Sequence, residues 1–256
     1  MRIVRYPSFF ILIIVIFSVT TPVYSADELD FLDDDFYMDE YVEESCPDVL
    51  EQYNRAIFTF NSEAYEHVLK PVATGYSKIM PQDARGAVSN FFRNIGEPVR
   101  FVNCLLQGRF EESAWVFSRF FINTVCGVFG FGDPATREFH VPPIEATFGE
   151  TLGEWGIGDG SYFVVPILGP STMRDFSGDL IGFSVLSPYT LIDDYWVVAS
   201  IQSVEMINNV SLNLDKIEDV KKLSFDPYVA LRDYYFQNRK TLRQHDEFEV
   251  NFHFEH

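Results

Sequence analysis

Basic residues are scarce in this chain. Its 256 residues include 19 lysines and arginines against 38 aspartates and glutamates, which gives a formal net charge of −19 at pH 7. A protein that binds nucleic acid needs a basic face to neutralise phosphate groups. The charge balance therefore excludes nucleic acid as an expected partner.

The sequence also lacks the patterns that mark common catalytic, metal and cofactor sites. It contains no H-E-x-x-H segment and no Walker A loop, and Gly160-Ser161 is not followed by the rest of a nucleophile elbow. Its five histidines are scattered along the chain. The run Gly156-x-Gly158-x-Gly160 resembles part of a dinucleotide fingerprint, but the final spacing and the preceding strand are missing. We therefore expect no enzyme, no catalytic residues, no metal and no cofactor.

Cysteines are few, and their odd number leaves at least one unpaired. Of the three, Cys104 and Cys126 lie in apolar stretches that read as helices, so we expect both to be buried as small hydrophobic side chains. Cys46 stands apart from them, close to the end of an acidic segment. The spacing of the three neither requires nor excludes a disulfide.

Long apolar runs are missing too, because no segment reaches the roughly 18 residues of a membrane-spanning helix. Residues 1–25 combine Arg2 and Arg5, the short apolar segment 9–19 and small-residue cleavage signals before Ala26. This pattern predicts a secretory signal peptide over 1–25, and the alternative is an uncleaved anchor.

The two ends of the remaining chain are polar. Residues 26–45 contain ten acidic residues and no basic one, which predicts an acidic linker. Such a segment is either a solvated, self-repelling tail or an arm that folds against a partner. Residues 244–256 are polar with interspersed phenylalanines, and we predict a disordered tail there.

Between these ends, apolar residues recur at helical spacing, so we predict one all-α domain over 46–243. Pro71 should end the first helix, Gly96-Glu97-Pro98 should break the second, and Asp226-Pro227 should cap and open the last. The expected helices cover residues 48–69, 81–95, 99–106, 111–126, 189–210 and 227–243.

Two glycine-rich stretches separate the helices. Residues 148–175 are dense in glycine, proline and aromatic residues, and we interpret them as a long irregular loop. Only Tyr162 to Val165 alternates like a strand there, and a helix should restart near Ser171 or Thr172. Residues 127–132 alternate glycine and phenylalanine, which is typical of either a tight turn or a mobile apolar gate.

The second half of the long loop carries a specific motif. Residues 156–175 read G-x-G-x-G-x-Y-x-x-x-P-x-x-G-P-S-x-x-R-D, and further matching segments lie at 53–61, 119–124 and 226–235. Together they resemble the MlaA (VacJ) family of outer-membrane phospholipid-transport proteins over residues 48–240. Family members typically carry a lipid on a cysteine just after the signal, whereas Ser25-Ala26 stands at that place here.

The resemblance implies an architecture and a function. The fold would be a flat ring of amphipathic helices around a polar channel, lying at the periplasmic face of the outer membrane. The protein would associate with a trimeric porin, remove mislocalised phospholipids from the outer leaflet, and pass them to a periplasmic lipid-binding protein of an ABC-transporter pathway. This chain would then be a non-enzymatic conduit located in the outer membrane without an evident lipoprotein cysteine.

The resemblance also suggests which residues handle lipid. Polar residues set among apolar neighbours could line the channel, although each could equally make a structural hydrogen bond or ion pair. These candidates are Asn54, Arg55, Asn61, Arg119, Asn123, Arg174 and Asp175. The gate and loop candidates are Phe129, Gly130, Phe131, Gly156, Gly158, Gly160 and Tyr162.

Two other functions stay open. One is a soluble periplasmic module that binds a hydrophobic ligand without a porin. The other is a lipid hydrolase, for which no nucleophile and base occur at a recognisable spacing.

Overall fold

The computed structural model of the chain describes residues 48–249, with side chains except at 223 and 240–249. The predicted signal peptide and acidic linker, and Cys46, lie outside the described residues, as does the end of the predicted tail. Within the described range the chain is mostly helical, with one small sheet, so the prediction of an all-α class is confirmed.

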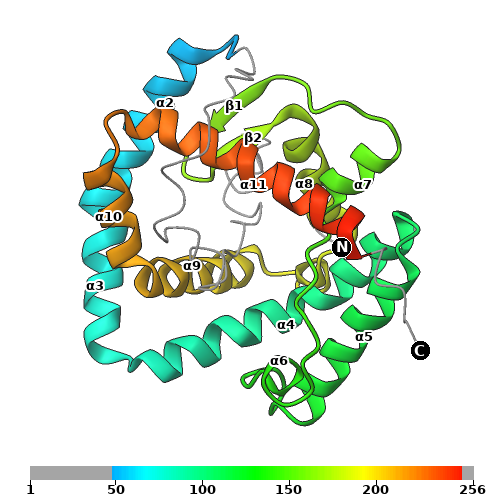
Figure 1. Cartoon of the computed structure of the whole chain (residues 1–256). Helices are drawn as coiled ribbons and strands as arrows, with labels where there is room; N and C mark the ends of the chain where they lie inside the picture. The colour runs from blue at the N-terminus through cyan, green and yellow to red at the C-terminus, as the bar shows by residue number, and fades with distance from the viewer. Residues whose placement is uncertain (1–47, 250–256) are drawn as a thin grey trace, which may run out of the picture.

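The helices follow one another around a ring (Figure 1). Helices α3 and α4 form two adjoining sides, α5 and α7 continue the circuit, and α11 crosses the top. The helical elements are α2 (Glu51–Ala64), η3 (Tyr65–Leu69), α3 (Lys70–Ile79), α4 (Gln82–Leu106), α5 (Phe110–Val125), α6 (Pro134–Arg137), α7 (Phe148–Glu154), α8 (Met173–Val185), η4 (Pro188–Leu191), α9 (Tyr195–Leu212), α10 (Leu214–Leu223) and α11 (Pro227–Glu249). The strands are β1 (Tyr162–Val165) and β2 (Gly169–Thr172).

The ring is closed by contacts between its first and last helices. Arg55 of α2 donates to Asp226, just before α11, at 2.9 Å, and the Tyr228 hydroxyl donates to Asp48. The helix α11 begins where the sequence predicts, with the Asp226 carboxylate accepting from the Tyr228 N–H at 3.1 Å. It ends at Glu249, six residues beyond the expected boundary at 243.

Neither of the two expected proline breaks occurs. Pro71 does not end the first helix, because the wide π turn η3 leads into α3 and leaves Pro71 in the first turn of α3. Pro98 lies inside the continuous helix α4. The Arg100 guanidinium donates to the Arg93 carbonyl at 3.0 Å and so supports the backbone of the turn before this proline.

The stretch 148–175 is not the long irregular loop that its glycines suggested. It contains α7, which begins with a capping box between Thr147 and Glu150, and the antiparallel hairpin of β1 and β2. The strand-like reading of Tyr162–Val165 is confirmed, and α8 restarts as predicted, with the Thr172 hydroxyl accepting from the Asp175 N–H at 3.2 Å. Irregular backbone is limited to residues 155–161.

The long helix expected from Tyr189 starts later. Pro188 opens only the 3-10 turn η4, and α9 begins at Tyr195, where the Asp194 carboxylate accepts from the Trp196 N–H at 2.9 Å. The separate helix α10 was not expected.

The interior of the described chain is unusually polar. Fifteen polar or charged residues are buried there, against fourteen hydrophobic ones, while 28 large hydrophobic side chains are exposed. The buried hydrophobic residues form two small clusters, one around Cys104 and Val116 and one around Tyr162 and Tyr228. The prediction that Cys104 is buried is confirmed, whereas Cys126 lies on the surface at the end of α5.

Candidate functional site

Two asparagines of α2 hold the free edge of β1. The fully buried Asn54 accepts from the Val164 N–H at 2.8 Å and donates to the Tyr162 carbonyl at 3.4 Å. Asn61, two helical turns later, accepts from the Ile167 N–H at 2.6 Å and donates to the Val165 carbonyl at 3.0 Å. The two side-chain amides thereby replace the neighbouring strand that β1 lacks on this edge.

A second polar cluster lies between α4, α5 and the loop before α6. The fully buried guanidinium of Arg119 donates to both carboxylate oxygens of Asp133 at 3.2 Å and to the Thr136 hydroxyl at 2.8 Å. Asn123 donates to the same carboxylate at 2.9 Å, and Arg93 also pairs with it. Burial alone would raise the pKa of Asp133, but the Thr136 hydrogen bond and the two arginines outweigh it and lower the pKa to about 2.

The glycine and phenylalanine segment 127–132 is a packed turn beside this cluster. The Phe131 ring stacks on Phe91 with centroids 4.6 Å apart. Gly130 has a φ of +90°, and a Cβ there would lie 2.6 Å from Asn94, so only glycine fits. Phe129, in contrast, points outward and is 72% exposed. The base of the segment is therefore a tight turn, whereas Phe129 forms an exposed tip. A role of this segment as a gate stays a prediction.

The third polar cluster fastens the loop 155–161 to α8 and α11. Arg174 pairs with Asp159 in that loop and donates to Asp175 at 3.1 Å. The other oxygen of Asp175 accepts from the Tyr235 hydroxyl and from Arg239, both at 2.6 Å. Burial would raise the pKa of Asp175, but the charge of Arg239 and the Tyr235 hydrogen bond keep it below its ordinary value.

The loop glycines differ in what they contribute. Gly156 and Gly160 adopt φ values of +86° and +72°, which an L side chain rarely takes, whereas Gly158 lies in open space. Tyr162, at the end of the loop, is buried among the aromatic rings of α11.

The structure therefore places the polar candidates in separate clusters. Asn54 and Asn61 lie on one side of the hairpin and Arg174 and Asp175 on the other, whereas the Arg119 cluster lies beside α6 at the far side of the ring (Figure 1). Arg55 is the one candidate with a half-exposed side chain, and it bridges Glu51 and Asp226. Each candidate makes an internal bond in this structure, and a role in lipid passage stays a prediction for all of them.

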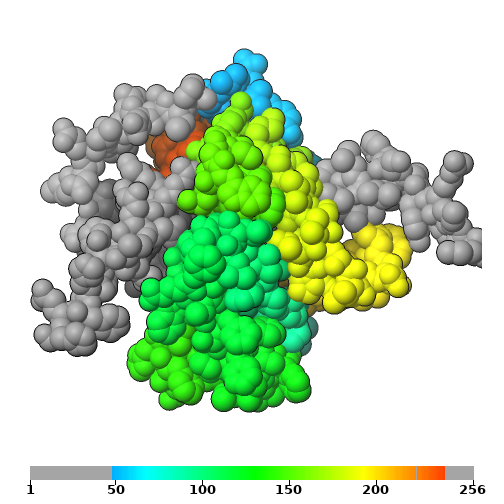
Figure 2. Space-filling model, turned by 90° about the vertical axis from the view of Figure 1, so that its right-hand side faces the viewer, coloured from blue at the N-terminus to red at the C-terminus, as the bar shows by residue number. Residues whose placement is uncertain are grey.

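Apolar side chains cover much of the outer surface. On α5 the side chains of Phe110, Phe117, Phe121 and Val125 recur on one helical face, and each is more than half exposed. Figure 2 shows this side of the molecule, with the green α5 region below the α7 and hairpin segment. Exposed apolar surface of this extent marks contact with lipid or with another protein.

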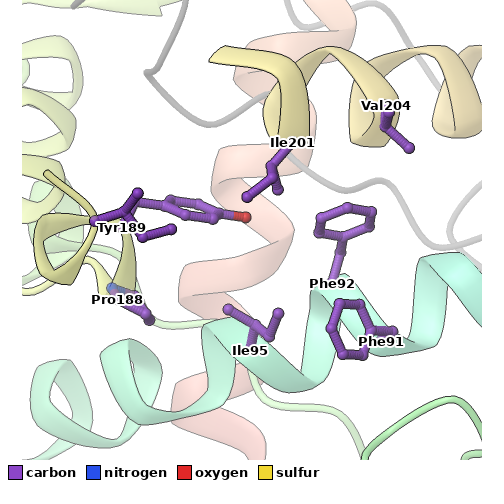
Figure 3. A pocket seen from close by; sticks show the side chains of 8 residues that line it. Phe91, Phe92, Ile95, Pro188, Tyr189, Ile201 and Val204 are labelled. Atoms are coloured by element: carbon purple, nitrogen blue, oxygen red, sulfur yellow. The ribbon is translucent and has the colours of Figure 1, made fainter. Parts of the chain in front are cut away.

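Sequence reasoning missed an apolar pocket of about 420 Å³ between α4, η4 and α9 (Figure 3). Its lining comes from three segments far apart in the chain, and no motif links them. The lining residues are Phe91, Phe92, Ile95, Pro188, Tyr189, Ile192, Ile201 and Val204.

Two kinds of feature are missing from residues 48–249. None of their helices is both long enough and apolar enough to cross a bilayer. Nor does that part of the chain gather three or more histidine, cysteine or carboxylate side chains into a group that could hold a metal ion.

Comparison with known proteins identifies the family. The family model described as MlaA lipoprotein matches residues 46–242, which is more than half of the chain. The chain belongs to the MlaA family. The ring of helices with its inner hairpin is therefore the MlaA fold, and the motifs at 53–61, 119–124, 156–175 and 226–235 all fall within the matched range.

Named relatives support this assignment. The Intermembrane phospholipid transport system lipoprotein MlaA of Escherichia coli is 34% identical over 204 residues, which cover 76% of this chain and 78% of that protein. The protein of the same name from Haemophilus influenzae is 32% identical over 195 residues, which cover 75% of this chain and 77% of that protein. An uncharacterised protein of Rickettsia felis is 30% identical and covers 92% of this chain.

A solved structure has the same fold. It is described as "Structural basis for maintenance of bacterial outer membrane lipid asymmetry" and is 34% identical in sequence. It superposes with a TM-score of 0.67 and covers 77% of this chain and 98% of its own length.

Proposed function

We propose that this MlaA-family protein is a non-enzymatic phospholipid conduit of the outer membrane. It removes mislocalised phospholipids from the outer leaflet and thereby maintains lipid asymmetry. The names of the E. coli and H. influenzae relatives, which refer to intermembrane phospholipid transport, support this function. The observation that carries the proposal is the inverted distribution of side chains, with polar networks buried between the helices and many large apolar side chains exposed.

The physical argument rests on the cost of moving a charged headgroup through hydrocarbon, which is several kcal/mol or more. A ring with an apolar outer surface can lie among acyl chains while its polar interior shields a headgroup. Of the polar candidates, Arg55 keeps a half-exposed guanidinium that can meet a phosphate. The other six position the walls through their internal hydrogen bonds.

A complementation experiment tests the conduit. A Gram-negative host that lacks its own MlaA-family protein is given this chain, and surface phosphatidylethanolamine is measured with an amine-reactive dye that does not cross membranes. We expect the dye signal to fall to the level of the parent strain. A signal that stays at the level of the deletion strain, with the protein present in the outer membrane, would contradict the proposal.

Anchoring and partners belong to the same proposal. The relatives are named lipoproteins, and in this chain the exposed apolar side chains of the ring would hold the protein in the membrane. A trimeric porin and a periplasmic lipid-binding protein would be its partners. In-cell crosslinking followed by mass spectrometry should recover both partners with the full chain.

The alternative is a soluble periplasmic module that binds a hydrophobic ligand, and the apolar pocket is the observation in its favour. Washing isolated outer membranes at high salt and alkaline pH separates the two functions. A conduit should stay in the membrane together with phospholipid, whereas a soluble module should leave as a monomer.

A further inference from the structure

The pocket between α4, η4 and α9 is bounded on three sides by side chains that meet across it (Figure 3). Phe92 and Ile95 rise from α4, Ile201 comes from α9 on the opposite side, and the Tyr189 ring closes one end. The volume of about 420 Å³ falls within the range of roughly 300–1,000 Å³ that is usual for small-molecule sites. The pocket is therefore large enough for a ligand and is formed by the described helices themselves.

The floor of the pocket is held in place from outside. The Phe91 ring stacks on Phe131 of the packed turn with centroids 4.6 Å apart, and it meets Phe92 edge to face at 5.7 Å. Tyr189 is packed in turn against Phe183, with ring centroids 6.3 Å apart. Because the lining rings have partners on their far sides, the pocket cannot close by simple collapse of one side chain.

The pocket has almost no polar group in its lining. The Tyr189 hydroxyl is the only polar side-chain group among the eight lining residues, and it hydrogen-bonds to the Glu205 carboxyl of α9. Burial raises the pKa of Glu205 to about 7, although Tyr189 and the charge of Arg100 oppose this rise.

Val204, one of the lining residues, is 47% exposed and so lies at the surface of the pocket. Further apolar side chains are exposed on the same elements, namely Trp196 and Val197 about two turns earlier in α9, and Leu191 of η4. A hydrocarbon chain could therefore reach the lining past exposed apolar side chains.

We propose that this pocket holds one acyl chain of a phospholipid while its headgroup remains outside. The inference rests on the proposed conduit function and adds a defined place for the hydrocarbon part of the substrate. An unbranched hydrocarbon chain suits the lining, because the chain needs no hydrogen bond there. A free fatty acid offers the same hydrocarbon chain without the phospholipid headgroup, and the assignment to a phospholipid follows from the proposed conduit function.

Photolabelling of the full chain tests the pocket directly. The protein is reconstituted in vesicles of phosphatidylethanolamine and phosphatidylglycerol that contain a trace of phospholipid with a diazirine near the end of one acyl chain. After irradiation, we expect mass spectrometry to find the label on Phe92, Ile95 and Ile201. A phospholipid with the diazirine in its headgroup should not label these residues. Label confined to the exposed face of α5 would overturn the proposal.

A pocket-filling variant provides the second measurement. In Ile201→Trp the indole occupies the pocket, so acyl-chain labelling of α4 should fall by about tenfold or more. Ser200→Trp is the matched control, because Ser200 is exposed on the same helix and does not line the pocket. Unchanged labelling of α4 in Ile201→Trp would contradict the proposal. If that variant fails to fold, the positions labelled in the wild-type protein decide the question.

Two further comparisons are needed. One distinguishes a phospholipid from a free fatty acid as the source of the acyl chain, and the other distinguishes failure of the acyl-chain site from failure of the conduit function. A free fatty acid with the same diazirine should label the lining weakly, and equal labelling would overturn the assignment to a phospholipid. Complementation by the wild-type chain without label in the pocket would refute the acyl-chain site and leave the conduit function intact. Label in the pocket without complementation would refute the conduit function instead.

Discussion

The side-chain oxygen of Asn54 accepts a hydrogen bond from the backbone N–H of Val164 at 2.8 Å, 110 residues away in the chain. Both groups are fully buried, and no water can replace the bond. Together with Asn61, Asn54 thus ties α2 to the hairpin, which in turn packs against α11 through Tyr162.

Replacing Asn54 should therefore destabilise the protein. In Asn54→Ala the Val164 N–H and the Tyr162 carbonyl lose their partner, and each buried unpaired group costs about 1–3 kcal/mol. The free energy of unfolding, measured by denaturant titration in mild detergent, should fall accordingly. Asn90→Ala is the control, because Asn90 makes only an exposed contact of 3.4 Å, and its effect should be within about 0.5 kcal/mol. Equal effects of the two substitutions would show that the hydrogen bonds of Asn54 contribute nothing to the free energy of unfolding.

The low pKa of Asp133 predicts a loss of stability in acid. The pKa falls from 3.8 to about 2 on folding, so the ionised carboxylate stabilises the fold above pH 3.8 by about 2 kcal/mol. This contribution should disappear as the pH falls through 2. Asp133→Asn should lose it at neutral pH and should show a flatter dependence of unfolding free energy on pH below 4. Asp193→Asn, at an exposed position, should behave like the wild type.

The raised pKa of Glu205 predicts that stability depends on pH in the opposite direction. Its pKa rises from 4.5 to about 7 on folding, so the folded state binds an extra proton between these values and stability decreases as the pH rises through this window. Glu205→Gln keeps a partner for Tyr189 and removes the charge. It should be more stable than the wild type by about 2–3 kcal/mol at pH 8 and no more stable at pH 4. A gain of the same size at both pH values would show that ionisation is not the cause, and Glu154→Gln at an exposed site is the control.

Two helical glycines should respond to alanine with opposite sign. A Cβ at Gly178 would lie 2.4 Å from the Gly149 nitrogen, because α8 and α7 meet backbone to backbone there. Gly178→Ala should push the helices apart at a cost of about 1–3 kcal/mol. A Cβ at Gly86 meets nothing within 4 Å, so Gly86→Ala should stabilise α4 by about 0.5–1 kcal/mol. Thermal unfolding of both variants checks the pair, and destabilisation by Gly86→Ala would contradict the packing argument.

The long helices could be predicted from the sequence because their signals are local. Helix α5 shows helical spacing over its whole length, and α11 begins with an Asp-Pro pair whose capping geometry needs only neighbouring residues. The breaks predicted at Pro71 and Pro98 were wrong because that prediction also used only local signals. The support that Pro98 receives from Arg100, and the π turn before Pro71, depend on bonds that a rule about single residues does not include.

The candidate site was less predictable because its contacts are distant in the chain. The motif named Arg174 and Asp175, but nothing local indicates that Arg239 and Tyr235 complete their cluster. The pocket shows the same limit, because Ile95, Tyr189 and Ile201 become neighbours only when α4 and α9 pack together. Short elements such as α7 and β2 were hidden by glycines whose role is close packing, as at Gly149.

The closure of the ring by its last helix has a consequence for biogenesis. Arg55 and Asp48, near the start of the described chain, find their partners Asp226 and Tyr228 only after almost all of the protein has been synthesised. Until then the hairpin, which packs against α11, lacks its cover, and its apolar side chains are exposed to water. A chain that ends before residue 226 would lack both closing contacts and the helix that covers the hairpin, so the fold depends on its last helix in a way that no truncation series from the C-terminus can bypass.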